Sequence, residues 1–265
     1  MEKQLQLVID YMQSHWPSRV KPEWQVGIDE YPKIVEQVVS LWTKNASKNH
    51  EFARIAGVSG SGKTTQLLPA VTAYFERTEK QPILVAARRF VEFHPHMEEI
   101  KNEYGEENLR KNTDEFSTIM MFMTLHALIS KGFDIILDVT LLDTKIEGIL
   151  TEMLTSNNYN FWLTMIAVSP EISQKFLGGR AWRHTKETEQ EFIRATSLAL
   201  DFYKTNCENM RIILWNVWDT QPIYDGKIKN ALETWQKYSA ISEYTTKFTE
   251  DDLREAKIRY LTCGK

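Results

Sequence analysis

Short hydrophobic runs recur through the middle of the chain, and each is followed by a stretch with helical periodicity. Short, mainly apolar runs of this length indicate strands that are buried on both faces. They cover residues 52–58, 82–86, 133–139, 161–168 and 210–217. Hydrophobic positions spaced three and four residues apart predict helices at about 63–78, 95–104, 117–131, 143–157, 171–183 and 188–206. This alternation predicts an α/β fold, in which helices cover both faces of a parallel sheet.

Both ends of the chain show helical spacing instead of strand-like runs. We therefore expect a helical N-terminal extension at 1–48, a core at 49–224, and a helical C-terminal extension at 225–265 that packs on the core. In a parallel sheet the carboxyl ends of the strands meet at one edge, where ligands bind. We therefore expect the functional residues to lie where the predicted strands end.

The first strand leads into a glycine-rich segment, GVSGSGKT at 57–64, which fits the pattern G-x-x-x-x-G-K-[ST]. A strand before it and a helix after it are the context that a phosphate loop requires. Glycines let several backbone N–H groups point at one anion, and the following helix adds the positive end of its dipole. We expect Lys63 to reach the β- and γ-phosphates of ATP or GTP, and Thr64 to hold Mg²⁺. The expected nucleotide-binding residues are Gly57, Ser59, Gly60, Ser61, Gly62, Lys63, Thr64 and Thr65.

A carboxylate follows the apolar strand FDIILDV, because Asp138 stands where that strand should end. Phosphoryl transfer uses a carboxylate on the metal side of the phosphates. Asp138 is therefore a candidate to bind Mg²⁺ through water, or to hold an acceptor hydroxyl; the alternative is a solvated carboxylate that caps the next loop. Thr140 lies two residues further and points to the same side of an extended chain, which makes it a candidate for substrate binding.

Arginines cluster after the strand at 161–168, and a γ-phosphoryl group in transfer needs positive charge around its oxygens. We expect a mobile lid at about 176–195 that brings Arg180 or Arg183 over the triphosphate. Arg194 is a further candidate for substrate binding. The alternative is a surface helix whose arginines are solvated.

The order of these motifs resembles the zeta-toxin family of P-loop kinases over about residues 52–200. The resemblance rests on the phosphate loop, then FVEFHPHMEEI, ILDVT and IAVSPEISQKFLGGRAWR. It implies a parallel-sheet kinase core that phosphorylates a nucleotide sugar, UDP-N-acetylglucosamine, with a nucleoside triphosphate and Mg²⁺. It also implies a small antitoxin protein as a partner.

The resemblance assigns roles to individual residues. Lys63 and Thr64 match the family's phosphate-loop pair. Asp138 and Thr140 match its acidic-x-Thr substrate motif, with Asp where Glu is common. Arg180 or Arg183 matches the arginines of the family's lid.

One position departs from the family. The family carries an acidic general base a few residues before the His-Pro pair, whereas this chain reads Ala-Ala-Arg-Arg at 86–89. Three interpretations stay open. Glu92 or Asp138 takes over as the base; Arg88 and Arg89 bind a different, anionic acceptor; or the protein binds nucleotide and transfers phosphate poorly. His94 is a further candidate base, although a histidine in a His-Pro turn is more typical of packing or capping.

Charge and composition argue against a nucleic-acid-binding, secreted or membrane protein. A net charge of −4 over 265 residues gives no basic field of the kind that binds nucleic acid. Cys207 and Cys263 form neither a disulfide framework nor a metal-ligand spacing, which is typical of a reducing compartment. The N-terminal segment lacks the apolar stretch of a signal peptide, and no run reaches the roughly 18 apolar residues of a membrane helix. We expect a cytoplasmic protein without a membrane partner.

Together these features predict a P-loop kinase of zeta-toxin type that uses ATP or GTP to phosphorylate an alcohol group of a small molecule. Two other classes stay open. The missing acid at 86–89 and the terminal helices favour a degenerate nucleotide-binding module that acts through a protein partner. Arg88, Arg89, Arg110 and Lys111 would favour a polynucleotide 5′-kinase, against the acidic net charge.

Overall fold

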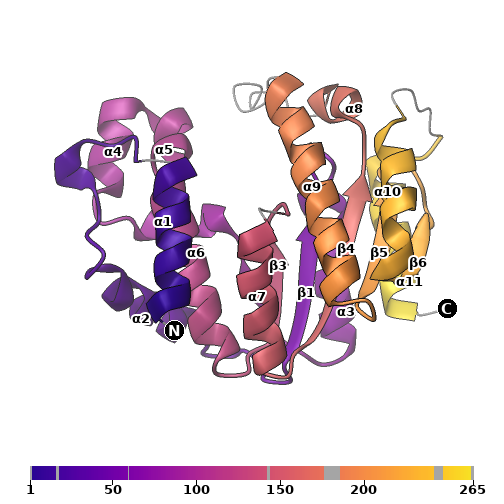
Figure 1. Ribbon diagram of the computed structural model, residues 1–265, viewed down its shortest axis with the longest axis horizontal. Coiled ribbons are helices and arrows are strands. Elements are labelled where there is room, and N and C mark those ends of the chain that lie inside the picture. Colours follow the sequence, from indigo (N-terminus) through magenta and orange to yellow (C-terminus); the bar gives the residue numbers. More distant parts are fainter. Residues whose placement is uncertain are drawn as a thin grey trace. The chain divides into compact units, whose positions relative to one another are not determined.

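The computed structural model describes residues 2–15, 18–58, 60–141, 144–175, 186–241 and 247–263; at 2–5, 12–13, 15 and 186–192 it describes the backbone alone. The chain, drawn in Figure 1, divides into two compact units. The first unit combines Met1–His50 with Ile83–Ile135, and the second combines Glu51–Pro82 with Ile136–Lys265. Each unit is described by itself.

The first unit is mainly helical and is built around α6. Its elements are α1 (Glu2–His15), η1 (Pro22–Trp24), α2 (Tyr31–Trp42), β2 (Ile83–Val85), η3 (Ala87–Phe93), α4 (Met97–Tyr104), α5 (Glu106–Asn112) and α6 (Asp114–Ile129). Helix α6 carries the apolar stretch FSTIMMFMTLHALI and packs against α1, α2 and η3. A helix that is hydrophobic on all sides is stable only when it is surrounded in this way. No helix among the described residues is long and apolar enough to cross a membrane.

The second unit contains the sheet. Its strands are β1 (Glu51–Ala56), β3 (Ile135–Asp138), β4 (Asn160–Ala167), β5 (Arg211–Asn216) and β6 (Tyr224–Lys227), in the order β3-β1-β4-β5-β6. Strands β1 and β5 both pair with β4 in parallel, so that Ile55 lies opposite Thr164 and Thr164 opposite Ile213. Strand β6 pairs with β5 in the antiparallel direction at the edge of the sheet.

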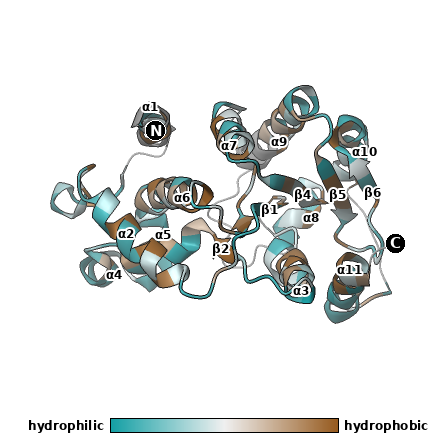
Figure 2. Cartoon of the chain, turned by 90° about the horizontal axis from the view of Figure 1, so that it is seen from below, coloured by the Kyte–Doolittle hydropathy of each residue, from teal (hydrophilic) through white to brown (hydrophobic). Residues whose placement is uncertain are grey.

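Helices cover both faces of this sheet, as Figure 2 shows. They are η2 (Lys63–Leu67), α3 (Leu68–Arg77), α7 (Thr144–Ser156), α8 (Pro170–Lys175), α9 (Lys186–Asn206), η5 (Ile228–Asn230), α10 (Ala231–Ser239) and α11 (Glu250–Cys263). Helices α7, α9 and α10 lie on one face, and α3 and α11 pack together on the other. A core that includes Leu163, Met165, Leu214 and Trp235 fills the space between the sheet and α9 and α10.

The predicted sheet with helices on both faces is confirmed, and so are helices at both ends of the chain. One correction concerns the C-terminal part. The sequence predicts helices alone at 225–265, whereas this part begins with β6, which makes the sheet mixed rather than wholly parallel. The strand reads Tyr-Asp-Gly-Lys and is only partly buried, so it carries no hydrophobic run by which to recognise it.

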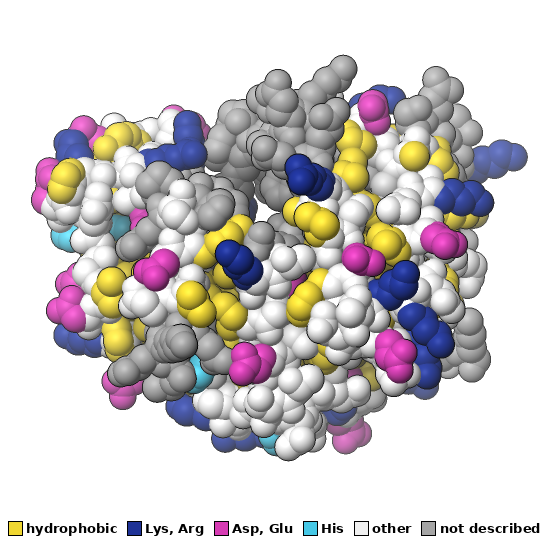
Figure 3. Space-filling model, viewed as in Figure 1, with side chains coloured by type: hydrophobic (Ala, Val, Ile, Leu, Met, Phe, Trp, Pro, Cys, Tyr) yellow, Lys and Arg dark blue, Asp and Glu magenta, His cyan; other side chains and the backbone are white. Residues whose placement is uncertain are grey.

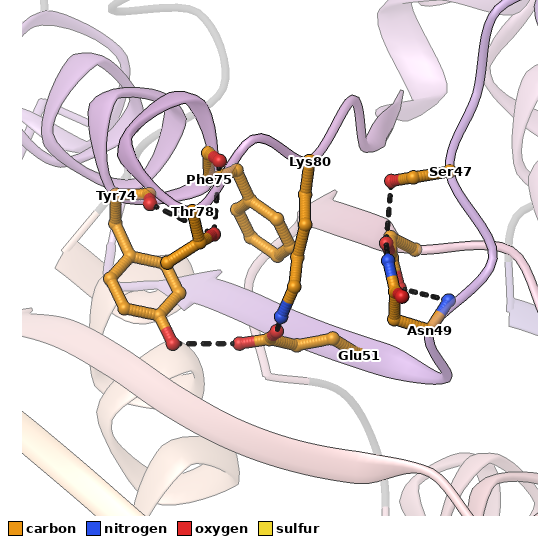
Figure 4. A network of polar contacts seen from close by, with 8 residues as sticks. Ser47, Asn49, Glu51, Tyr74, Phe75, Thr78 and Lys80 are labelled. Atoms are coloured by element: carbon orange, nitrogen blue, oxygen red, sulfur yellow. Dashed lines mark hydrogen bonds and ion pairs between the residues drawn. The ribbon is translucent and has the colours of Figure 1, made fainter.

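Each unit contains a buried carboxylate held by polar contacts, and Figure 4 labels Glu51 of the second unit with its partners. In the first unit, Asp134 accepts hydrogen bonds from the hydroxyl of Ser47 at 2.5 Å and the backbone N–H of Asn49 at 2.9 Å. In the second unit, Glu51 accepts a hydrogen bond from Tyr74 at 2.9 Å and pairs with Lys80. A buried charge is tolerated only when it is paired and hydrogen-bonded, so these carboxylates have structural roles.

Candidate functional site

Strand β1 leads directly into the phosphate loop, whose glycines adopt backbone conformations that other residues avoid. The φ angles of Gly57, Gly60 and Gly62 are 138°, 77° and 90°. A Cβ added at Gly57 would lie 2.8 Å from the Oγ of Ser61 and 3.1 Å from the carbonyl oxygen of Ile166 in β4. The loop therefore requires glycine at Gly57 both for its φ angle and for its close approach to the neighbouring strand.

Polar groups of the loop are arranged to receive an anion. Ser61 is 0% exposed, and its Oγ has no hydrogen-bond partner among the described residues. The Nζ of Lys63 donates to the carbonyl oxygens of Gly57 at 2.7 Å and Val58 at 2.9 Å. A buried hydroxyl without a partner is costly, and an ammonium group gains more from a phosphate than from neutral carbonyls. These residues fit a bound triphosphate.

The helix after the loop adds further groups. Thr64 and Thr65 are exposed at the start of η2, which leaves their hydroxyls accessible to a ligand. Gln66 was missed by the sequence reasoning: it is buried, and its Nε2 would lie 3.2 Å from a Cβ at Gly62. A glutamine just after the phosphate-loop pattern, in the predicted helix, was the available signal. Ser59, another predicted nucleotide ligand, lies outside the described residues.

Asp138 and Thr140 belong to the same unit as the phosphate loop. Asp138 closes β3, which neighbours β1 in the sheet, and is 5% exposed. Thr140 is half-buried, and its carbonyl oxygen accepts a hydrogen bond from Arg54 at 2.9 Å. No group of three His, Cys, Asp or Glu side chains within the described ranges is placed to hold a metal ion. A cation bound here would depend on Thr64, Asp138 and phosphate oxygens.

The predicted lid is described only in part. Arg180 and Arg183 lie outside the described residues, as does the first half of the 176–195 segment. Arg194 is on α9 in the second unit, and its side chain is exposed.

The predicted substrate arginines and the alternative base lie on η3 in the first unit. The guanidinium of Arg89 lies 4.3 Å from the ring centroid of Trp42 and donates to the carbonyl oxygen of Leu84. Burial lowers the pKa of Arg89. These contacts give Arg89 a packing role within its unit, whereas Arg88 is half-buried and Glu92 is exposed.

His94 is held as a packing and capping residue. Its Nδ1 accepts the backbone N–H of His96 at 3.1 Å, and its ring contacts Phe116 with centroids 4.5 Å apart. Burial, with the nearby His96, lowers the pKa of His94 to about 4, against a smaller opposing effect of Glu99. The imidazole is therefore neutral at pH 7, and its Nδ1 is already occupied.

The sequence reasoning also missed Arg54, which lies in the middle of β1 and forms a buried ion pair with Glu147. Tyr203 completes the group, since its hydroxyl donates to Glu147. An arginine inside the hydrophobic run FARIAGV was the available signal, because a charged side chain in a strand buried on both faces needs a buried partner.

One face of the molecule can be inspected for charge in the space-filling view of Figure 3. Basic and acidic side chains are interspersed on the face drawn in Figure 3. This distribution agrees with the net charge of −4 and gives no support on that face to a nucleic-acid groove.

Comparisons with known proteins agree on one family. The profile of a family described as Zeta toxin matches residues 42–228. The chain is 26% identical over 132 residues to Toxin PezT of Streptococcus pneumoniae serotype 4, and this match covers 49% of each protein. The chain thus spans about half the length of that curated relative.

A solved structure from the PezAT chromosomal toxin-antitoxin system of Streptococcus pneumoniae has the same fold. It superposes with a TM-score of 0.66 at 20% identity, and the match covers 90% of this chain and 98% of that chain.

Proposed function

Because this chain belongs to the zeta-toxin family of kinase-like toxins, we propose that it transfers the γ-phosphoryl group of ATP or GTP to a hydroxyl group of a small molecule. The observation that carries the proposal is the phosphate loop. We assign the anion site at the start of η2 to its three glycines with positive φ, the buried hydroxyl of Ser61 and the ammonium of Lys63.

Different residues of the loop would bind different parts of the triphosphate. Lys63 exchanges its bonds to Gly57 and Val58 for oxygens of the β- and γ-phosphates. The hydroxyls of Thr64 and Thr65 are accessible at the start of η2. Thr64 and Asp138 are the residues that would hold Mg²⁺, which when bound neutralises charge on the phosphate oxygens.

The transferring group also needs positive charge on its outer side. We propose Arg180 or Arg183 for this role, because both follow β4 and β4 neighbours β1. An arginine in such a position stabilises the charge of the transition state. Arg194 remains a candidate for substrate binding.

The acceptor hydroxyl needs a group that takes its proton. Asp138 is the candidate in the second unit and Glu92 is the candidate in the first. Single-turnover transfer by Asp138→Asn and Glu92→Gln distinguishes them. The variant that lacks the base loses the chemical step while it keeps its affinity for nucleotide, and a metal-side role of Asp138 appears as a raised Mg²⁺ requirement.

We propose a nucleotide sugar, with UDP-N-acetylglucosamine as the first compound to test, as the acceptor. The family membership supports this choice. The departure at 86–89 favours tests of other anionic acceptors as well, with Arg88 as the residue that would bind them. Arg89 would bind such an acceptor only after leaving Trp42 and the carbonyl oxygen of Leu84.

Transfer of labelled phosphate tests the proposal. The purified chain is incubated with Mg²⁺, γ-labelled ATP or GTP, and a panel of nucleotide sugars, nucleosides and sugars. We expect one class of acceptor to be labelled by the wild type and not by Lys63→Ala. The proposal fails if a folded wild-type protein labels no acceptor above the Lys63→Ala background.

We further propose that a protein antitoxin restrains this activity, because the related solved structure comes from a toxin-antitoxin system. Expression of the chain should then arrest growth, and Lys63→Ala should not. Equal growth of the two strains at equal protein levels would argue against a toxic kinase.

A nucleotide-binding module that acts through a partner is the second candidate. The observation that favours it is the Ala-Ala-Arg-Arg sequence at 86–89, where the family has its acid. Tight binding of triphosphate with no transfer to any acceptor would support this candidate over the kinase.

A further inference from the structure

A buried polar network lies next to the phosphate loop in the second unit. Arg54 is in β1, three residues before Gly57, and the Nη2 of its guanidinium donates to Oε1 of Glu147 at 2.9 Å. Its Nη1 donates to the other oxygen of Glu147 and lies 3.1 Å from the hydroxyl of Tyr203. Arg54, Glu147 and Tyr203 are 3%, 1% and 2% exposed, so water does not compete for these bonds.

The same guanidinium reaches the segment that carries the proposed metal and substrate residues. The Nη2 of Arg54 also donates to the backbone oxygen of Thr140 at 2.9 Å. Thr140 follows Asp138 by two residues, at the end of β3. One side chain therefore joins four parts of the second unit: β1, the segment after β3, α7 through Glu147, and α9 through Tyr203.

Packing alone does not explain this arrangement. A buried ion pair gains its Coulombic energy only after both charges have lost their water, and apolar side chains of similar volume often stabilise a core as well. The distinctive property of an Arg–carboxylate fork is its fixed geometry. Burial first, and then Glu147, raise the pKa of Tyr203 well above its ordinary value, so its hydroxyl remains a donor to the carboxylate.

We propose that Arg54, Glu147 and Tyr203 are positioning residues that hold the Asp138–Thr140 segment in the geometry needed for transfer. This inference rests on the proposed kinase function. The network acts through the backbone of Thr140 and touches neither phosphate nor acceptor. It therefore governs use of the acceptor, while the affinity for nucleotide depends on the phosphate loop.

The test replaces the network by apolar side chains of similar length. The double variant Arg54→Met with Glu147→Met removes both charges together and leaves no buried charge without a partner. Tyr203→Phe removes one hydroxyl and keeps the ion pair. Arg211→Met is the matched control, since Arg211 forms a two-bond pair with Asp225 at the sheet edge, away from the network.

Three measurements are made on each folded protein. Hydrogen exchange reports the backbone protection of residues 138–141. Calorimetry gives the affinity for ATP with Mg²⁺ and the number of binding-competent molecules. Transfer assays give the KM for the acceptor and kcat. Dividing the rate by the number of binding-competent molecules corrects kcat for any unfolded fraction.

We expect the double variant to lose protection at 138–141 by about tenfold and kcat/KM for the acceptor by about tenfold or more, because small displacements of reacting groups have effects of this size. Its ATP affinity should stay within about twofold of wild type, since the phosphate loop is unchanged. Tyr203→Phe should show about threefold changes in the same direction. Arg211→Met should change none of these quantities.

The positioning role is overturned if the double variant folds with unchanged exchange at 138–141 and unchanged acceptor KM and kcat. It is also overturned if ATP binding and transfer fall together. If the double variant does not fold, Tyr203→Phe decides in the same way. A wild type that labels no acceptor defeats the proposed function, and the exchange measurement then still decides whether the network holds this segment.

Discussion

The ammonium group of Lys63 lies 2.7 Å from the carbonyl oxygen of Gly57, at the start of the loop that Lys63 itself closes. A second bond to Val58 at 2.9 Å completes the arrangement. Both bonds lie within the loop, so the lysine must release them to bind a phosphate. The exchange is favourable because a charged acceptor gives a stronger hydrogen bond than a neutral carbonyl.

Lys63→Ala should therefore weaken binding of ATP and Mg²⁺ by about a hundredfold, a loss typical of a donor to a charged phosphoryl or oxyanion group. The free energy of unfolding without ligand should change by less than about 1.5 kcal/mol, since only exchangeable loop bonds are lost. Calorimetric titration and urea unfolding measure the two quantities. Lys229→Ala, which removes an exposed lysine, is the control and should change neither. Equal affinities for wild type and Lys63→Ala would contradict the role of the loop.

Gly57→Ala should destabilise the protein by about 1–3 kcal/mol, because alanine rarely adopts a φ of 138° and its Cβ would lie 2.8 Å from Ser61 Oγ. The matched control is Gly148→Ala in α7, where a Cβ would meet only Phe202 at an ordinary 3.6 Å. That change should stabilise the helix by about 0.4–1 kcal/mol. Urea unfolding of both variants checks the difference in sign. Similar effects at the two positions would argue against a strained loop.

Burial of His94 predicts a loss of stability in acid. Its folded-state pKa of about 4 lies below the ordinary 6.5, so at intermediate pH only the unfolded chain binds the proton. Stability should therefore fall as the pH drops from 6.5 towards 4, by about 2 kcal/mol between pH 7 and 5. Urea unfolding of wild type and His94→Gln at these two pH values measures the contribution. A wild type and variant with the same pH dependence would show that His94 titrates normally.

Lys257 of α11 predicts a second rise of stability with pH, in the alkaline range. It is fully buried, its Nζ donates to the carbonyl oxygen of Asp219 at 3.0 Å, and burial lowers its pKa to about 8. Between pH 8 and the ordinary 10.5 the unfolded chain holds a proton that the folded chain lacks, so stability rises with pH. Between pH 8 and 10, the free energy of unfolding of the wild type should rise by about 2 kcal/mol relative to that of Lys257→Met. The control Lys229→Met should follow wild type, and parallel curves for all three proteins would refute the lowered pKa.

Local patterns were sufficient for the buried strands and the phosphate loop. Strands β1 and β4 are largely buried on both faces, so each leaves a short, mainly hydrophobic run that can be read directly. The phosphate loop could be predicted because its glycines are required by backbone geometry at Gly57, Gly60 and Gly62. The strand β6 could not, since an edge strand of four mostly polar residues depends on its pairing with β5.

By itself, the sequence determined which groups were available: a phosphate loop, a carboxylate at the end of β3, and an arginine inside the first apolar strand. Only the tertiary structure decided what that arginine does. Its partners Glu147 and Thr140 are 93 and 86 positions away, brought together by the order of the strands and the helix that covers them. A buried charge must find an opposite charge within a few ångströms, and which one it finds depends on the path of the whole chain.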